Sequence, residues 1–191
     1  MKPLNQITRR KWQALKWRDP RTDLVALGRL QGRLRCAKFE DLRDRDLKSA
    51  REPLQAALFC YFISYALKTR IEYAMSEDED YDCVFRRKVD GATGYTPVQL
   101  KEIVPSRIDP KASIKTGLEN LKKYRTSDHT VVAFHVNHSG YFDYHSMPKP
   151  ETSFAEIWFY GPLTSDLFLW ELYGDLLHQP RRYEIPWPMP E

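Results

Sequence analysis

The sequence predicts a mixed α/β fold whose core follows the order helix, three strands, helix, strand (αβββαβ), with a mixed central sheet flanked by helices and an N-terminal helical extension. Three observations support this prediction. The stretch 53–67 is apolar nearly all round, which is typical of a helix buried against a sheet. Apolar and polar side chains alternate through much of 69–104, as they do in strands. An amphipathic stretch at 113–125 precedes a largely apolar, β-rich stretch at 130–136.

Length and composition predict one ordinary domain with additions at its ends. The chain has 191 residues, of which 42% are hydrophobic and 13% aromatic, so it is long enough to bury a substantial core. We expect a basic helical extension at 1–48, an α/β domain at 49–180 and a Pro-rich tail at 181–191. The longest apolar run, 56–67, is too short to cross a bilayer, so no membrane partner is expected.

The first fifty residues are strongly basic and contain two helix-compatible segments, 7–16 and 22–34. They carry fourteen Lys or Arg against six Asp or Glu, a net charge of +8, whereas the whole chain carries +4. A basic end of this kind attracts phosphate backbones without regard to base sequence. We expect contacts with DNA, most simply a duplex, from the side chains of Arg9, Arg10, Lys11, Arg29, Arg33, Arg35 and Lys115.

The basic segment has alternative roles within the protein. Arginines are ordinary on solvated helix faces, and the mixed charges of 39–48 predict a salt-bridged surface helix or a linker. The arginines can pair with the acids at 40–46 and 76–80 as an intramolecular clamp. They can also contact a second copy of the chain in a homodimer.

The stretch 82–101 predicts the antiparallel hairpin on which the functional prediction rests. Side chains alternate along its first strand, so Tyr81 and Asp82 are expected on opposite faces. The turn is expected at 90–94, which contains two glycines. Pro97 is expected at the start of the second strand, because proline cannot donate a hydrogen bond to a neighbouring strand.

Three polar side chains of this hairpin are expected to converge. Asp82 provides a carboxylate, Gln99 an amide oxygen and Lys101 an ammonium group. Mg²⁺ prefers oxygen ligands and commonly takes one or two carboxylates plus water and substrate phosphate, so Asp82 and Gln99 are candidate metal ligands. Lys101 is a candidate for orienting the attacking water and offsetting charge in the transition state. Asp80 is the alternative to Asp82 as ligand.

At Asp82 and the Gln-x-Lys run 99–101, the sequence resembles the PD-(D/E)XK nuclease superfamily, whose mark is an acidic residue on one strand and Glu-x-Lys or Gln-x-Lys on the next. The Gln form is similar to that of the Mrr-type restriction endonucleases. This resemblance implies a restriction-endonuclease-like core and hydrolysis of DNA with Mg²⁺ or Mn²⁺. It also implies a catalytic glutamate on the helix before the sheet, for which Glu52 is the match. Tyr81 stands where the family has its proline.

The remaining elements follow from periodicity. After the helix at 113–125 and the strand at 130–136, a further strand is predicted at 154–160 and a last helix at about 165–177. The intervening loop, 137–151, contains the aromatic residues Tyr141, Phe142 and Tyr144, for which stacking on bases is one role. A zinc site is the other hypothesis for this region, from His135, His138, Asp143 and His145.

A second functional hypothesis is a catalytically inactive module with the same fold that binds nucleic acid or a protein partner. The Gln at the ligand position, Tyr81 in place of the proline and the basic first fifty residues favour it. The sequence contains neither a G-x-S-x-G motif nor a Gly-rich nucleotide-binding loop, which excludes the corresponding hydrolases and nucleotide-driven enzymes.

The cysteines and the N-terminus indicate the compartment. Cys36, Cys60 and Cys83 are odd in number and far apart, and two of them lie in apolar segments, as expected for reduced, buried thiols. The first residues lack the apolar core of a secretory signal. We therefore expect a cytoplasmic protein.

Overall fold

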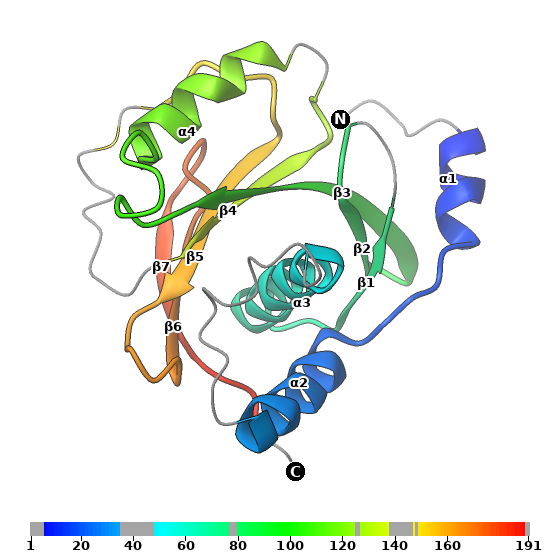
Figure 1. Cartoon of the computed structure of the whole chain (residues 1–191). Helices are drawn as coiled ribbons and strands as arrows, with labels where there is room; N and C mark the ends of the chain where they lie inside the picture. The colour runs from blue at the N-terminus through cyan, green and yellow to red at the C-terminus, as the bar shows by residue number, and fades with distance from the viewer. Residues whose placement is uncertain are drawn as a thin grey trace. The chain divides into compact units, whose positions relative to one another are not determined.

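The computed structural model describes residues 6–34, 48–76, 80–124, 127–137, 147 and 149–189. The chain forms two compact units, Met1–Pro97 with Pro188–Glu191, and Val98–Trp187. It is mixed α/β, as the sequence predicts, and its strands follow one another in a single hydrogen-bonded order (Figure 1). None of the helices described is both long enough and apolar enough to cross a membrane.

The sheet combines parallel and antiparallel neighbours. Its strands are β1 (Ile71–Met75), β2 (Cys83–Val89), β3 (Ala92–Ile103), β4 (Val131–Val136), β5 (Glu156–Pro162), β6 (Leu169–Gly174) and β7 (Arg181–Pro186). β1 pairs antiparallel with β2, and β6 pairs antiparallel with both β5 and β7. β4 pairs parallel with both β3 and β5. A parallel pair needs a crossover connection, and the one between β3 and β4 contains α4 (Ile114–Asn120).

In the described part of the first unit, the helices before β1 are α1 (Gln6–Gln13), α2 (Pro20–Leu34) and α3 (Lys48–Leu67). α2 begins at Pro20, earlier than expected, because Asp19 caps it. The Asp19 carboxylate accepts a hydrogen bond from the Thr22 backbone N–H at 3.1 Å, and proline suits the first helical position. The charged segment 39–47 lies outside the described residues.

α3 is the buried helix that the sequence predicts. Every side chain from Leu54 to Cys60 is buried, and the helix packs against α2 and β1. It begins at Lys48, five residues before the apolar stretch 53–67 on which the prediction rests. Pro53 lies inside the helix, where it leaves one intrahelical hydrogen bond unmade. Cys60 is a buried free thiol, and so is Cys83, as predicted.

The segment between α1 and α2 is joined to β1 by backbone and side-chain hydrogen bonds. Arg18 and Tyr73 exchange backbone hydrogen bonds of 2.8 and 3.0 Å. The Tyr73 hydroxyl donates to the Asp23 carboxylate at 2.6 Å, and Arg18 pairs with the same carboxylate at 2.8 Å. Burial, reinforced by the hydrogen bond to Asp23, raises the pKa of Tyr73 above its ordinary value, so this phenol stays a donor.

The β2–β3 hairpin turns over two residues. Asp90 and Gly91 both have positive φ, 50° and 79°, which is the backbone of a type I′ turn. The expectation of a turn spanning 90–94 is therefore wrong, because β3 already begins at Ala92. The tight turn lengthens the second strand, and Pro97 consequently lies in its interior rather than at its start.

The second unit buries an apolar cluster on the face of the sheet that α4 covers. The cluster includes Leu118 of α4, Phe134 of β4 and Phe159 of β5, and the two phenylalanine rings stack at 5.1 Å. α4 is shorter than the predicted helix 113–125. Ser113 caps it by accepting from the Thr116 backbone N–H, and the chain continues as a short 3-10 helix, Leu121–Lys123.

The predicted last helix, 165–177, is wrong. This stretch contains β6, which is buried on both faces: Trp170 and Leu172 on one side, Glu171 and Tyr173 on the other. A run that is apolar on all sides fits a buried helix and an interior strand equally well by periodicity, and its aromatic content favours the strand. Part of the segment 181–191, expected as an extended tail, forms β7 beside it.

A buried ion pair joins β6 to β7. Arg182 Nε lies 2.6 Å from Oε1 of Glu171, although the two atoms lack hydrogen-bond alignment, and the side chains are 30% and 3% exposed. Burial raises the pKa of Glu171, while the Arg182 guanidinium acts in the opposite direction. The arginine therefore offsets the cost of a carboxylate inside the sheet.

We predict that Arg182→Met destabilises the protein by roughly 2 to 3 kcal/mol, because it leaves the Glu171 carboxylate buried without its partner. Urea unfolding measures the loss, and adding Glu171→Gln to the same variant recovers part of it. The matched control is Arg181→Met at the exposed neighbouring position, which should change stability by less than about 0.5 kcal/mol. Equal losses at the two arginines would contradict the ion-pair account.

Candidate functional site

Gln99 and Lys101 lie two residues apart on β3 and therefore share one face of that strand. Their partners on β4 are Val132 and Phe134, whose side chains belong to the cluster beneath α4. Gln99 is buried, at 8% exposure, and Lys101 is half-buried. The prediction that the amide and the ammonium group emerge side by side is thus met within the second unit.

The Lys101 ammonium group is held by Tyr124. Its Nζ donates a hydrogen bond of 2.7 Å to the Tyr124 hydroxyl and lies 5.1 Å from the centre of the same ring. A charged donor and a cation near an aromatic ring each strengthen such a contact relative to a neutral pair. Lys101 therefore has a defined position rather than a freely rotating side chain.

Tyr124 is itself anchored through its carbonyl group and its ring. It follows the 3-10 helix in extended conformation, with φ −89° and ψ 120°. Its carbonyl accepts a hydrogen bond of 2.9 Å from Ser153 Oγ, and its ring packs on that of Phe154 with the ring centres 5.1 Å apart. The sequence prediction included Tyr124 only as part of the amphipathic helix 113–125 and missed this role. The helical spacing of the segment contained no signal that the chain leaves the helix just before Tyr124.

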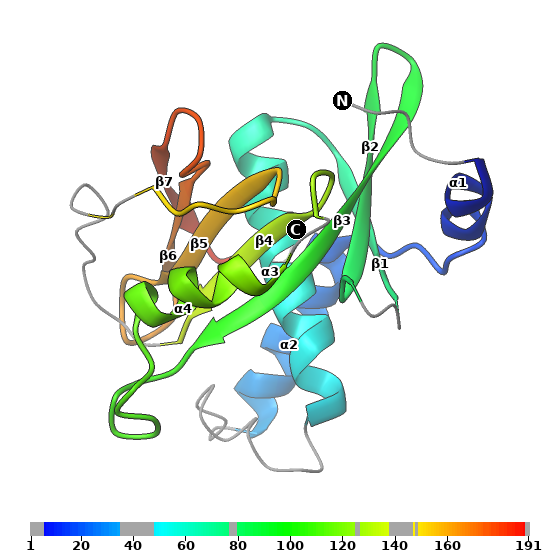
Figure 2. The same ribbon diagram turned by 90° about the horizontal axis from the view of Figure 1, so that it is seen from above.

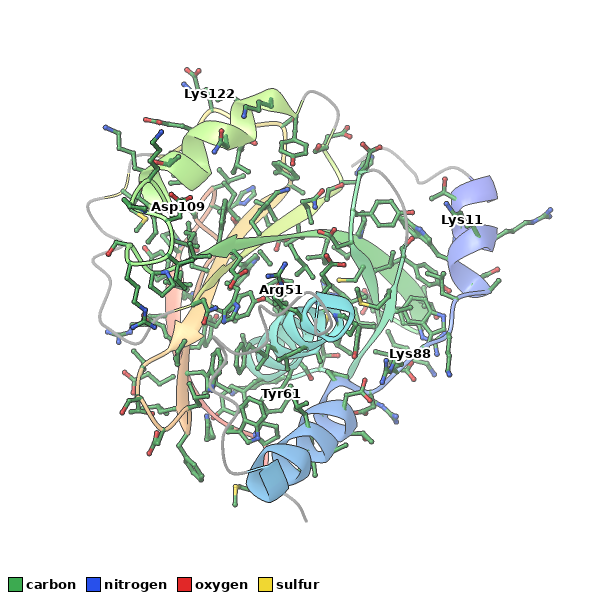
Figure 3. The ribbon with its side chains drawn as sticks, in the orientation of Figure 1. Lys11, Arg51, Tyr61, Lys88, Asp109 and Lys122 are labelled. Atoms are coloured by element: carbon green, nitrogen blue, oxygen red, sulfur yellow. The ribbon has the colours of Figure 1, made fainter. Side chains whose placement is uncertain are left out.

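Lys101 lines a cleft of about 440 Å³ within the second unit. The end of β3, the loop that precedes α4 and α4 itself form its walls. Lys111, Thr116 and Lys123 contribute to the lining, and Glu102 and Asp109 are its acidic members. Figure 3 labels Asp109 in the loop before α4 and Lys122 just after that helix. The lining thus holds three ammonium groups and two carboxylates together with hydroxyl and amide groups, and its small net positive charge favours a phosphate-bearing ligand.

Asp82 belongs to the first unit and immediately precedes β2 at a bend in the chain. Its side chain is half-buried, and its carbonyl accepts from the Ser76 backbone N–H at 3.0 Å. Asp80, the alternative ligand, is exposed. The next residue, Cys83, lies against Cys60. A hydrogen bond between the two thiols, together with burial, raises the pKa of Cys83. Such a thiol stays protonated and unreactive.

The expectation that the regular alternation of the first strand includes Tyr81 is wrong. Tyr81 packs with Val84 and with Trp12 of α1, because the bend at Asp82 interrupts the strand alternation before β2 begins. Tyr81 accepts a hydrogen bond of 2.8 Å from the indole N–H of Trp12. Tyr81 therefore helps to hold α1 in the first unit.

The predicted site residues are divided between the two units: Asp82 and Glu52 in the first, Gln99 and Lys101 in the second. Glu52 is exposed on α3, one residue before Pro53. In the part of the chain that the structure describes, no three side chains of His, Cys, Asp or Glu are grouped closely enough to hold a metal. The structure thus brings together Gln99 and Lys101, and adds Tyr124 to them.

The expected nucleic-acid contacts are only partly described. Arg9, Arg10 and Lys11 are exposed on α1, and Lys115 is exposed on α4. The side chains of Arg29 and Arg33, and the whole of Arg35, lie outside the described part of the structure.

Of the four residues in the zinc hypothesis, only His135 is described. It lies in β4 and is 1% exposed. Its ring stacks on those of Tyr160 and Trp170, with ring centres 5.0 and 6.0 Å apart. His138, Asp143 and His145 lie outside the described residues, and so do Tyr141, Phe142 and Tyr144. The described surroundings of His135 are those of an aromatic core.

Comparison with known proteins found no family, no curated protein and no solved structure that matches this chain. The functional argument therefore rests on the side chains themselves.

We predict that Tyr124→Phe frees Lys101 without disturbing the packing on Phe154, because only the hydroxyl group is removed. The rate at which an amine-directed acylating reagent modifies Lys101, followed by mass spectrometry, should rise severalfold, and stability should fall by about 1 kcal/mol. The internal control is Lys115, which is exposed on α4 and should react at an unchanged rate. If Lys101 reacts equally in both proteins, the hydroxyl does not hold it.

Proposed function

We propose that this chain is a metal-dependent nuclease that hydrolyses phosphodiester bonds in DNA. The observation that carries the proposal is the position of Gln99 and Lys101 on the same face of β3, where Lys101 borders a cleft that two further lysines line. A half-buried cation next to an oxygen donor suits the developing negative charge of a phosphoryl group under attack.

The order of elements adds support. α3, β1, β2, β3, α4 and β4 follow one another in the order αβββαβ, which is the order implied by the resemblance to the PD-(D/E)XK superfamily. In that resemblance the Gln-x-Lys run belongs on the third of these strands, and Gln99 and Lys101 lie on β3. We propose a restriction-endonuclease-like core on this basis.

Asp82 is proposed as a ligand because it matches the acidic strand residue in the resemblance to the PD-(D/E)XK superfamily. Its half-buried carboxylate is the metal-binding group that the first unit would contribute.

The donors suit Mg²⁺ or Mn²⁺. The Asp82 carboxylate and the Gln99 amide oxygen are hard ligands, and ions of this kind commonly bind through few protein groups, with water and substrate phosphate completing the shell. When bound, such an ion polarises the phosphoryl oxygen and lowers the pKa of water. Glu52 is proposed as a further member of the site.

The chain's own residues perform the remaining tasks. Lys101, held by Tyr124, orients the attacking water and balances the charge that develops on the phosphoryl oxygens. The water oxygen bonds to phosphorus and gives up a proton to solvent as the bond to the leaving oxygen breaks, and the leaving oxygen takes up a proton from solvent. The lysines of the cleft and Lys115 of α4 attract the phosphate backbone.

A non-catalytic module that binds nucleic acid or protein is the second candidate. The hydrogen bond between Lys101 and Tyr124 favours it, because a lysine occupied by a phenol also fits a purely structural role. Its cytoplasmic location and a homodimeric state remain expectations under either candidate.

We predict cleavage of plasmid, duplex or single-stranded DNA in the presence of Mg²⁺ or Mn²⁺. Asp82→Ala and Lys101→Ala should each lower the rate by at least about 100-fold, because each removes a group that acts on the transition state. Asp80→Ala tests the alternative ligand and should have little effect. Unchanged cleavage in both Asp82→Ala and Lys101→Ala would remove the assignment, and an inert wild type would favour the binding module.

Gln99→Glu separates a metal ligand from a buried structural amide. A carboxylate at a ligand position should tighten Mn²⁺ binding by about one order of magnitude, measured by calorimetry. Without metal the buried charge should lower stability, and Mn²⁺ should restore it, because binding to the folded state stabilises that state. Gln55→Glu is the matched control, since Gln55 is equally buried on α3 and its carboxylate should cost stability that Mn²⁺ does not restore. Identical behaviour of the two variants would show that Gln99 is not a ligand.

A further inference from the structure

Exposed basic side chains from two segments far apart in the sequence meet within the first unit. α1 presents Arg9, Arg10 and Lys11, and the end of β2 presents Lys88 with the half-exposed Arg87. Figures 1 and 2 both show α1 beside the hairpin, and Figure 3, where Lys11 and Lys88 are labelled, shows both on the right-hand side of the view. Arg87 and Lys88 are consecutive strand residues, so they point to opposite faces of the hairpin. We call these five side chains, on α1 and on both faces of the hairpin end, the basic surface.

A direct contact joins the two segments. The guanidinium of Arg9 donates a long hydrogen bond, 3.5 Å, to the backbone carbonyl of Thr93, a residue 84 positions away. The two-residue turn sets Thr93 opposite Lys88 on the hairpin. The guanidinium of Arg9 therefore lies against β3, the strand next to Lys88 of β2.

A buried tryptophan holds α1 in this position. Trp12 is 1% exposed and donates a hydrogen bond of 2.8 Å to the Tyr81 hydroxyl. Its ring packs on that of Tyr95, with the ring centres 6.0 Å apart. Behind it, Arg86 lies 4.4 Å from the ring of Trp17 and pairs with Glu72 at 2.8 Å. An isolated helix as short as α1 is marginal in water, so its place beside the hairpin depends on this docking.

The arrangement gathers like charges that repel one another. Glu72 is engaged by Arg86, and Asp90 at the turn is the acid that the hairpin tip itself contributes. Like charges brought together raise the free energy of the folded state, and the negative charge of a bound polyanion offsets that repulsion. Binding also releases the counterions of the polyanion, which favours the complex. The tip from Lys88 to Ala92 is exposed, and a two-stranded ribbon has the width that the major groove of a duplex admits.

We propose that the basic surface, formed by α1 and the tip of the β2–β3 hairpin, binds the phosphate backbone of duplex DNA. This inference rests on the proposed function, since DNA is the substrate there, and it adds the hairpin residues Arg87 and Lys88 to the surface that holds the duplex. The contacts are to phosphates, so binding should depend strongly on salt and weakly on base sequence.

The test is binding of a short labelled DNA duplex in buffer that contains a chelator, so that cleavage plays no part. The hairpin variant Arg87→Gln/Lys88→Gln is compared with Lys68→Gln/Arg70→Gln, which removes the same charge from exposed positions of the same unit. Between about 50 and 200 mM salt, the hairpin variant should flatten the slope of log affinity against log salt by about 2, and the control should keep the wild-type slope. Equal thermal midpoints verify that both variants fold.

Three outcomes would overturn the proposal: equal slopes in the two variants, no salt-dependent binding of the duplex by the wild type, or binding of anionic phospholipid vesicles in preference to the duplex. A separate cleavage assay with Mn²⁺ distinguishes this inference from the proposed function. Hairpin-dependent binding without cleavage supports the surface and rejects the nuclease, whereas cleavage with equal slopes rejects the surface and leaves the nuclease in place.

Discussion

The continuity of β3 constrains the rest of the structure, because each backbone N–H and C=O group of an interior strand needs a partner. β3 leaves a two-residue turn beside β2 and pairs parallel with β4 from Val98 to Ile103. A parallel partner cannot follow through a tight turn, so the crossover with α4 is required. Pro97, which has no N–H to donate, lies in this strand at the position where the first unit ends and the second begins. The candidate residues Gln99 and Lys101 follow directly, in the part of β3 that pairs parallel with β4.

Two aromatic residues with polar atoms position the charged groups on which the functional argument depends. Tyr124 presents its hydroxyl to Lys101 while its ring packs on Phe154. Trp12 donates to the Tyr81 hydroxyl while its ring lies in a buried cluster beneath α1. Such side chains combine apolar burial with one directed hydrogen bond, so they fix a neighbouring polar group without placing a second charge in the interior. Each unit thus contains one cationic feature whose position depends on a half-buried or buried ring.

The elements that the sequence predicted well are those in which burial follows from local apolar content. The central part of α3 is apolar on every side, and β4 is buried at every position, so both are evident without knowledge of their neighbours. β6 is equally apolar but was predicted as a helix, because a run buried on both faces has no period to separate strand from helix. Its strand state follows from pairing with β5 and β7, which are contacts that local periodicity does not report.

The sequence by itself determined that Gln99 and Lys101 share a face, because a strand alternates with a period of two whatever surrounds it. It also determined that a short turn lies near Asp90 and Gly91. Tertiary structure alone decided that Tyr124 holds Lys101 and that Arg9 reaches Thr93, since these pairs are 23 and 84 residues apart. Local periodicity acts within a few residues, whereas these contacts depend on where a helix ends and how it docks. Those positions are set by the packing of the whole unit.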